Sequence, residues 1–415
     1  MVDKISLYDY QKQVVRELLN GKRIVQAGCG LGKTAMAIVW AEQEARRTGK
    51  KKLLVVTTSS KSKTHDWQDE ADLFAPDLKG MLDEFTIISW HKFAAWQKKH
   101  ITTGYIIIYD EVQRSKNGVS SGMGRAFLKA NSNCTSWIGL TGTPGDSWIQ
   151  FYPYFVATNK VKNKTEFVRN FCEIQTYRGF PEIKRYYHED ILRKWWSEIS
   201  YSPDTSVVES QLPSETHKVI KFSTPPNYKK VLTTRKRLDN GEMIDNISAL
   251  THYLRQLCFT KDKEEWVRDF ITDTGEPMVM FFNYTSTADK VQEIAEKALP
   301  KGARVWRIDG SHHEIPTAET IGDRDIVLCQ WQSGSEALNL QYLHIWVSLE
   351  PHYAYSTSVQ ARGRIRRLGQ QKHMVYLYLE CDKAIEGDVY EILRNKGEFS
   401  AKNWAIKNNL IKEKE

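Results

Sequence analysis

The sequence predicts an α/β protein with two tandem, doubly wound parallel-sheet lobes and a mainly helical insertion between them. Short runs rich in β-branched and aromatic residues alternate with amphipathic stretches, which is typical of parallel strands covered by helices on both faces. This alternation occurs twice and fades in between. With 415 residues, 41% of them hydrophobic, the chain is long enough for two cores. We expect a first lobe at 1–150, the insertion and a linker at 151–274, and a second lobe at 275–415.

The expected strands of the first lobe follow one another in chain order. The run RIVQ precedes a glycine-rich loop and the helical stretch AMAIVWAEQEA, so that strand, loop and helix come in succession. Further strands are expected at 52–58 (KLLVVTT), 105–111 (YIIIYDE) and 137–144 (WIGLTGTP). Because these runs are largely continuous in apolar residues, they are expected in a parallel sheet that is covered on both faces.

The remainder of the chain contains the insertion and a second set of strands. Segments such as FVRNFCEIQTYRGF and DILRKWWSEIS lack the strand rhythm and predict helices, and TDTGEP has the composition of a linker. The strands of the second lobe are expected at 278–284, 305–310, 325–330, 344–351 and 374–380. This second set predicts a second parallel sheet.

Composition narrows the class of protein. No apolar run approaches the roughly 20 residues that span a bilayer, and the N-terminal residues lack a secretory signal, so we expect a cytoplasmic protein. The six cysteines are scattered without CxxC spacing, which predicts reduced, mostly buried thiols and no zinc site. The adjacent His312 and His313 are expected to be solvated polar residues on a turn. A net charge of +8 suits a polyanionic partner without demonstrating one.

The segment AGCGLGKT at 27–34 has the composition of a phosphate-binding loop in the required context, between a strand and a helix. Its glycines would let backbone N–H groups approach phosphate, Lys33 would bridge the β- and γ-phosphates, and Thr34 would ligate magnesium. The glycines concerned are Gly28, Gly30 and Gly32. Ala27 stands where the strict pattern has glycine, and the alternative is a glycine-rich turn that binds no nucleotide.

Acidic and hydroxyl residues follow two further expected strands. Asp110 and Glu111 come directly after YIIIY, at the strand end where parallel sheets place their ligands. Asp110 would hold magnesium, and Glu111 would polarise or deprotonate the attacking water. Thr141 and Thr143, within LTGTP, end another expected core strand. Their position in chain order favours a relay between the nucleotide state and the second lobe.

The segment QARGRIRRLGQ at 360–370 brings a cluster of arginines to the second lobe. It is expected to begin as a helix, which would place Arg364 and Arg367 on one face. These guanidiniums could neutralise a transferring phosphate if the second lobe closes over the first. The alternative is a solvated or nucleic-acid-binding basic helix.

In this order, the segments AGCGLGKT, DEVQRSKN, LTGTP, SGSEALNL and QARGRIRRLGQ resemble the motifs of the superfamily 2 helicase-like ATPases, most closely the Swi/Snf-type DNA translocases of compact bacterial or phage type. The resemblance covers most of both lobes. It implies two RecA-like lobes, with ATP and Mg²⁺ as cofactors. It also implies DNA as the partner, above all duplex DNA contacted through its backbone.

The resemblance assigns further residues. Tyr10 and Gln11 in LYDYQ would form the adenine-reading element, and Gln113 stands where a histidine would help to couple the lobes. Short hydroxyls, amides and glycines would hold a nucleic-acid backbone, which carries no sequence information. These residues are Thr57, Thr58 and Ser59 in the first lobe, and Asn283, Tyr284 and the segment from Gly334 to Asn339 in the second.

The chain departs from the family pattern at Ser335 and Ala337, where glycines are usual, and at Gly363, where an acidic residue is usual. Three alternative functions stay open: a fork- or junction-unwinding helicase, an RNA-directed helicase, and a non-catalytic nucleic-acid-binding scaffold. Trp195 and Trp196 could form an unwinding wedge, although a buried pair is the expected interpretation. The compact size is compatible with a protein partner that supplies targeting.

Overall fold

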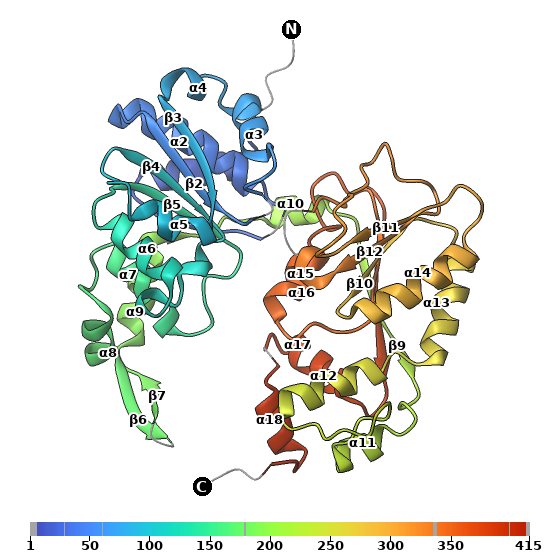
Figure 1. Cartoon of the computed structure of the whole chain (residues 1–415). Helices are drawn as coiled ribbons and strands as arrows, with labels where there is room; N and C mark the ends of the chain where they lie inside the picture. The colour runs from blue at the N-terminus through green and yellow to red at the C-terminus, as the bar shows by residue number, and fades with distance from the viewer. Residues whose placement is uncertain are drawn as a thin grey trace. The chain divides into compact units, whose positions relative to one another are not determined.

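Both predicted parallel sheets are present in the structure. A computed structural model describes residues 6–28, 30–59, 61–177, 180–334, 338–397 and 399–411. The chain divides into two compact units, Met1–Glu209 and Ser210–Glu415 (Figure 1). Within the described residues, each unit holds one six-stranded sheet, and the strands pair in parallel throughout. The predicted α/β class with two parallel-sheet lobes is therefore confirmed.

The sheet of the first unit has the expected apolar strands at its centre. Its order is β3 (Glu84–Ser89), β2 (Lys52–Thr57), β4 (Tyr105–Asp110), β5 (Ser136–Thr141), β1 (Ile24–Gln26) and β8 (Ser200–Tyr201). β4 and β5 are buried along their whole length. Because β1 lies beside β5 whereas β2 lies beside β4, the connection through the first long helix skips two strands. Such crossovers leave the carboxyl ends of the strands open for a ligand.

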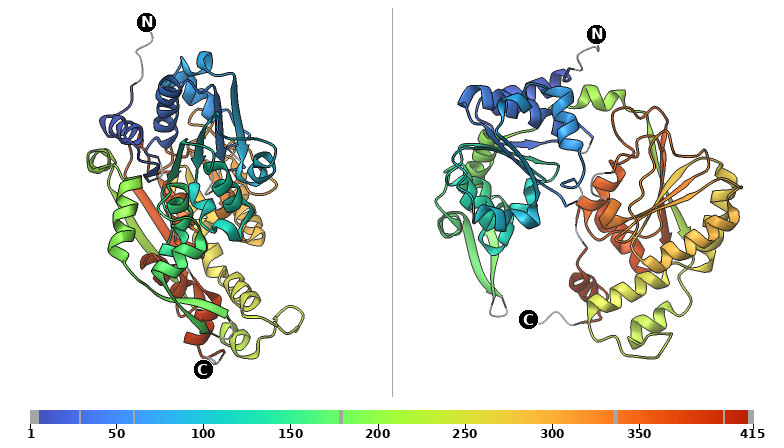
Figure 2. Two further views of the ribbon diagram at one scale, coloured as in Figure 1. Left: turned by 90° about the vertical axis from the view of Figure 1, so that its left-hand side faces the viewer. Right: turned by 45° about the horizontal axis from the view of Figure 1, so that its top comes forward.

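Helices cover both faces of this sheet (Figure 2). Residues of β2 alternate between two cores, because successive side chains of a strand point to opposite faces. Leu53 belongs to the core beneath α2 (Lys33–Thr48) and α3 (Asp66–Phe74), whereas Leu54 belongs to the core beneath α5 (Trp90–Gln97) and α6 (Gly122–Asn131). The other helices of the unit are α1 (Asp9–Leu19), α4 (Leu78–Met81), α7 (Tyr152–Ala157), α8 (Lys164–Phe171) and α9 (Glu189–Ile199).

The segment 151–274 is shared between the two units. Its first part contains α7, α8 and α9, the antiparallel hairpin of β6 (Cys172–Tyr177) and β7 (Phe180–Tyr186), and β8 at the edge of the first sheet. α10 (Ser206–Gln211) spans the division between the units. The second part contains β9 (Glu215–Phe222), α11 (Tyr228–Thr234), α12 (Ile247–Leu257) and α13 (Lys261–Thr274). Helices make up most of this segment, but Cys172–Tyr177, within a run expected to be helical, forms β6, because it pairs with β7, and β8 and β9 extend the two sheets.

The tryptophan pair of α9 packs against the first unit. Trp195 lies 5.6 Å from Phe155 and 5.2 Å from Phe171 between ring centroids, and Trp196 lies 4.7 Å from Phe151. Both tryptophans are partly buried against the core below β4 and β5. The structure thus places them as packing residues.

The second unit repeats the layered arrangement. Its sheet has the order β11 (Val305–Ile308), β12 (Ile326–Gln330), β10 (Met278–Phe282), β13 (Ile345–Ser348), β14 (Met374–Cys381) and β9. Met280 of β10 faces the core formed with α13 and α14 (Thr285–Ala298), whereas Phe281 faces the core formed with α15 (Trp331–Gly334) and α16 (Tyr355–Arg362). A further core joins α11 and α12 to α17 (Ile385–Arg394) and α18 (Ala401–Lys407).

Among the helices of the described residues, none is both long enough and apolar enough to cross a membrane.

Candidate nucleotide and nucleic-acid sites

Four strand ends bring the predicted first-lobe residues to one edge of the sheet. β1, β2, β4 and β5 run parallel, so their carboxyl ends lie together. Two hydrogen bonds join neighbouring ends: Ala27 donates its N–H to the carbonyl of Thr141 at 3.0 Å, and Thr57 donates its hydroxyl to Asp110 at 2.8 Å. The glycine-rich loop and the acidic pair therefore belong to one site.

The glycine-rich loop leads into the N-terminus of α2. Gly30 and Gly32 have φ of 78° and 69°, which glycine adopts without a steric penalty. The loop directs its lysine inward, because Lys33 donates from Nζ to the carbonyls of Ala27 at 2.9 Å and Gly28 at 2.8 Å. Thr34 occupies the first turn of the helix. An anion is stabilised at such a helix N-terminus by free N–H groups and the helix dipole.

Tyr10 and Gln11, at the start of α1, pack against this loop. The Tyr10 hydroxyl donates to the carbonyl of Leu31 at 2.9 Å, and Gln11 Nε2 donates to the same carbonyl at 3.2 Å. Burial raises the pKa of Tyr10 to about 12. A Cβ on Gly32 would lie 2.3 Å from Gln11 Nε2, so this contact requires glycine at position 32. Both residues therefore hold the glycine-rich loop in place through the Leu31 carbonyl.

Asp110 is buried at the end of β4 and already holds a cationic side chain. Its Oδ2 accepts hydrogen bonds from Thr57 and from Lys61 Nζ at 2.9 Å. Trp90 donates its indole N–H to the Asp110 carbonyl at 2.7 Å and so anchors this strand end. Burial acts to raise the pKa of Asp110, but the Lys61 ammonium, the Thr57 hydroxyl and Lys33 together more than offset it, so that this pKa lies below its ordinary value. A charged carboxylate that already binds a cation is suited to act as a magnesium ligand.

Glu111 has a backbone conformation that side chains rarely adopt. Its φ is 54°, in the left-handed region, directly after the buried strand. The side-chain amide of Gln113 donates to Glu111 Oε2. Left-handed non-glycine residues cost energy and occur often at functional sites. Gln113 thus orients the carboxylate that the sequence predicts to act on water.

Thr141 and Thr143 form a turn after β5. Thr141 is buried, and its Oγ1 accepts a hydrogen bond from the Thr143 N–H at 3.0 Å. Since the Thr141 carbonyl also accepts from Ala27, this turn is tied to the base of the phosphate loop. This contact joins the residues of the predicted relay to the loop that is predicted to bind nucleotide.

The predicted nucleic-acid residues of the first unit differ in accessibility. Thr57 and Thr58 are buried, and Thr57 is engaged by Asp110. Ser59 is exposed at the turn that follows β2. Of these three residues, Ser59 is therefore the one whose side chain can reach an external backbone in this conformation.

The corresponding residues of the second unit lie at the carboxyl edge of its sheet. Asn283 follows β10 and donates its side-chain amide to the Pro351 carbonyl at 2.8 Å. Tyr284 is buried and donates its hydroxyl to the His252 carbonyl at 3.2 Å. Gly334 ends α15, and Asn339 is exposed. Ser335 and Ala337 lie outside the described residues.

The two predicted arginines are not on a helical face. α16 ends at Arg362, and Arg364 and Arg367 lie in the turns that follow. The reason is local: Ile365 is buried in the core, and Arg364 donates from Nη1 to the Leu338 carbonyl at 3.2 Å, so the chain turns inward. Arg364 is 6% exposed, whereas Arg367 is partly exposed. The expectation of a shared helical face is corrected accordingly.

Two residues of these edges were missed by sequence reasoning, Lys61 and Arg255. Lys61 lies in the loop after β2 and reaches Asp110 at the end of β4. Adjacent parallel strands bring their following loops together, but the sequence does not show which strands are neighbours of β2. Arg255 lies in α12, within a segment that has no motif, and its side chain is buried beside Tyr284 and Tyr353.

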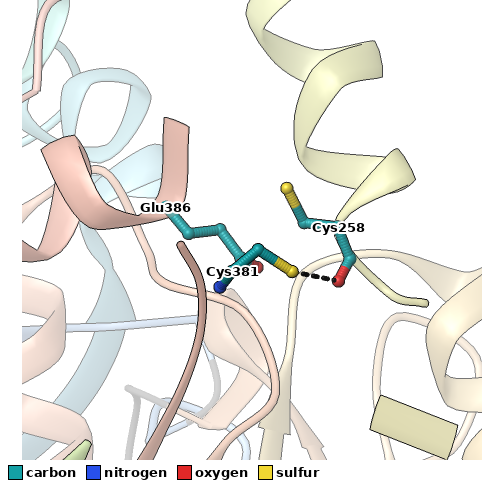
Figure 3. A group of neighbouring side chains, drawn as sticks. All are labelled: Cys258, Cys381 and Glu386. Atoms are coloured by element: carbon teal, nitrogen blue, oxygen red, sulfur yellow. Dashed lines mark hydrogen bonds between the residues drawn. The ribbon is translucent and has the colours of Figure 1, made fainter. Parts of the chain in front are cut away.

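A group of two thiols and a carboxylate in the second unit has the spacing of metal ligands but holds an ion pair. Cys258, Cys381 and Glu386 offer ligand atoms within 4.8 Å of one another (Figure 3). Lys263 Nζ lies 2.8 and 2.9 Å from the two Glu386 oxygens, so an ammonium already satisfies the carboxylate. Burial raises the pKa of Cys258 well above its ordinary value. The thiol is thus protonated at neutral pH, and the group serves packing.

Comparison with solved structures finds a similar ATPase core. The Sulfolobus solfataricus SWI2/SNF2 ATPase core in complex with dsDNA is similar to this chain over 95% of this chain and 92% of that one. Their sequence identity is 16%, and the TM-score is 0.42. No family model matches the chain, and no curated protein matches it. The function of the chain is therefore inferred from its own site residues.

Proposed function

We propose that this chain is a nucleic-acid-stimulated ATPase that moves along duplex DNA. One observation carries the proposal: the phosphate loop, Asp110 and Glu111 meet at one edge of the first sheet. Burial raises the pKa of Asp110, whereas Lys61, Thr57 and, to a smaller extent, Lys33 lower it, so Lys33 lies near enough to act on this carboxyl. A lysine for phosphate beside a carboxylate for metal is the arrangement that phosphoryl transfer needs.

The residues of the loop fit a nucleoside triphosphate. The 16-residue helix α2 presents its N-terminus at the loop, and the ammonium of Lys33 is held there by two carbonyl oxygens. It can turn from these neutral acceptors to phosphate oxygens. ATP is the nucleotide that the motif resemblance implies. Tyr10 and Gln11, which the same resemblance assigns to adenine, contact this loop.

Thr34 and Asp110 fit a magnesium ion, because they supply a hydroxyl and a charged carboxylate, the hard oxygen ligands that this ion prefers. A bound ion would stabilise the charge that develops on the transferring phosphate. Lys61 now neutralises Asp110, so it must withdraw from this carboxylate when the ion is bound. Glu111, oriented by Gln113, would accept a proton from the attacking water.

Arg364 and Arg367 keep their proposed role as cations for the transferring phosphate. Arg367 is the more accessible of the two, and Arg364 would have to leave its contact with the Leu338 carbonyl. DNA is proposed as the substrate from the motif resemblance together with the net charge of +8.

The test is steady-state ATP hydrolysis by the full chain with no nucleic acid and with duplex, single-stranded or forked DNA or RNA. Lys33→Ala and Glu111→Gln are expected to lower kcat by at least about 10²-fold, as removal of catalytic groups does in comparable sites. Lys79→Ala is the matched control, because Lys79 is an exposed lysine of the same unit that pairs with Asp72.

Strong stimulation by duplex DNA supports a translocase. A preference for forks or RNA would instead select one of the alternative motors. Wild-type hydrolysis in Glu111→Gln would remove this residue from the mechanism. If ATP were hydrolysed under none of these conditions, the result would favour the alternative of a non-catalytic nucleic-acid-binding scaffold over the proposed ATPase.

A further inference from the structure

Lys61 and the predicted metal ligand Asp110 form an ion pair at the carboxyl edge of the first sheet. Lys61 Nζ lies 2.9 Å from Asp110 Oδ2, and the two side chains are 23% and 2% exposed. An ammonium and a divalent cation cannot share this buried carboxylate, because like charges repel one another strongly away from water. The proposed function therefore requires a second position for the Lys61 ammonium.

A second acceptor lies on α3, the helix that follows the loop with Lys61. Glu70 of this helix is partly buried, and its Oε2 is buried without a hydrogen-bond partner among the residues that the structure describes. A buried polar atom without a partner costs free energy, and the cost is larger for a charged group. The Glu70 carboxylate would therefore be stabilised by a cation that reached it.

The charges around Glu70 indicate which cation this is. Burial raises the pKa of Glu70, Asp66 adds to the rise, Lys61 opposes it, and Asp69 adds a smaller rise. Asp66 and Asp69 are exposed in the first turn of α3, so they surround Glu70 with further negative charge. Lys61 supplies the opposing positive charge, and its ammonium thus lies within electrostatic range of both carboxylates, Asp110 and Glu70.

We propose that Glu70 is a positioning residue of the metal site, which accepts the Lys61 ammonium when a divalent cation takes its place on Asp110. This inference rests on the proposed function for the metal ion itself. A lysine ammonium sits on a long flexible stem and can change partners, so the displaced charge is not left unpaired. The same loop carries the exposed Ser59, so the transfer would connect the metal site with the predicted nucleic-acid contact.

The transfer makes metal affinity depend on two residues that do not bind the ion. Because the ion binds one of two arrangements, its measured affinity includes the free energy of moving the ammonium away from Asp110. A carboxylate at position 70 lowers that free energy by offering the ammonium a new partner. Removal of this carboxylate should therefore weaken metal binding, and the effect should depend on Lys61.

The experiment measures binding of Mn²⁺, as the probe for the metal ion, to the full chain in the presence of ADP. Electron paramagnetic resonance measures free Mn²⁺. Glu70→Gln is expected to weaken Mn²⁺ binding about tenfold, because the displaced ammonium loses a charged acceptor. In a chain that also carries Lys61→Met there is no ammonium to move, so the loss caused by Glu70→Gln should be at least about threefold smaller.

Two further variants separate the position of the carboxylate from its charge. Glu70→Asp keeps the charge but shortens the side chain, and it should weaken Mn²⁺ binding at least about threefold when Lys61 is present. Asp69→Asn is the matched control, because it removes an exposed charge of the same helix. Salt screens such a charge, so the affinity should change less than about twofold. Should Glu70→Gln fail to fold, Glu70→Asp carries the test with and without Lys61.

Unchanged or tighter Mn²⁺ binding in Glu70→Gln would overturn the proposal. So would an equal loss with and without Lys61, because Glu70 would then act through its charge alone. A third result would also overturn it: duplex DNA tightens Mn²⁺ binding in the wild type but not in Lys61→Met, while Glu70→Gln has no effect. The second partner of Lys61 would then be a DNA phosphate.

The failure of this inference is distinguishable from the failure of the proposed function. If the wild type bound no Mn²⁺ in the presence of ADP and hydrolysed no ATP, the proposed function would be refuted, and this inference with it. If the wild type bound Mn²⁺ and hydrolysed ATP but Glu70→Gln bound Mn²⁺ equally well, only the role of Glu70 would be refuted.

Discussion

The buried ion pair of Lys263 and Glu386 allows a sharp prediction for Lys263→Met. Methionine keeps most of the volume of lysine but lacks the ammonium. In the wild type, Lys263 Nζ lies 2.8 and 2.9 Å from the two carboxylate oxygens of Glu386. Both side chains are 0% exposed, so water cannot replace the lost partner. The N–H of Cys381 still donates to Glu386 at 2.9 Å.

The expected cost follows from this burial. Breaking a buried pair and leaving one charge costs about 3–5 kcal/mol. For a unit of roughly 200 residues, each kcal/mol lowers Tm by about 2–4 °C, so we expect Tm to fall by about 6–20 °C. Lys263→Met/Glu386→Gln should recover most of this loss, because the amide oxygen still accepts from the Cys381 N–H and no charge is left behind.

The variant should also have a particular pH dependence. Burial raises the pKa of Glu386, and the Lys263 ammonium is the largest effect that opposes this rise. Without the ammonium, the folded state binds more protons than the unfolded state, whose glutamate has a pKa of about 4.3. Stability is therefore lost as pH rises above about 4.3 and through the folded pKa. The Tm deficit of Lys263→Met should shrink as the pH falls toward about 4.3.

Scanning calorimetry of the full chain, with hydrogen exchange of peptides from α13 and α17, measures these effects in the second unit. Lys290→Met is the matched control, since Lys290 lies 2.8 Å from Glu264 but the two side chains are 53% and 29% exposed. An exposed pair contributes about 0–1 kcal/mol. If both variants lost the same small amount, burial would not decide the strength of these pairs, and the reasoning would be refuted.

Three further predictions concern single residues. Gly118→Ala should destabilise the first unit by at least about 1–3 kcal/mol, because φ is 48° and a Cβ would lie 1.7 Å from the Tyr152 hydroxyl; denaturant unfolding measures this. Lys61→Met should tighten Mn²⁺ binding about tenfold in the presence of ADP, because the ion no longer competes with an ammonium for Asp110; electron paramagnetic resonance measures free Mn²⁺. Burial lowers the pKa of His352 to about 4, so stability should be lost as pH falls from about 6.5 toward 4, and His352→Asn should flatten this part of the Tm profile.

Each of these has a matched control in the same unit. A Cβ added at Gly80 would have no atom within 4 Å, so Gly80→Ala should not destabilise. Lys63→Met changes an exposed lysine two residues from Lys61, and His373→Asn changes an exposed histidine of the second unit. Similar results for a variant and its control would contradict the contact that the prediction rests on.

Local patterns are enough to predict the central strands of both sheets and the glycine-rich loop, but not the edge strands β3, β8 and β9. Apolar runs such as YIIIY are buried because each lies inside a sheet covered on both faces, and this depends on the run itself. The loop likewise needs only its own glycines and the helix that follows. By contrast, the pattern of the basic segment 360–370 predicts a longer helix, whereas α16 ends at Arg362, because burial of Ile365 outweighs helix propensity.

The sequence by itself thus determined the α/β class, the two sheets and the glycine-rich loop before α2, since these depend on residues that are neighbours in the chain. Only the tertiary structure decided that Lys61 reaches Asp110, that Lys263 pairs with Glu386, and that Arg255 packs against Tyr284 and Tyr353. These contacts join residues 49 and 123 positions apart in the first two cases. Such pairs follow from the order of strands in the sheet, which no local pattern specifies.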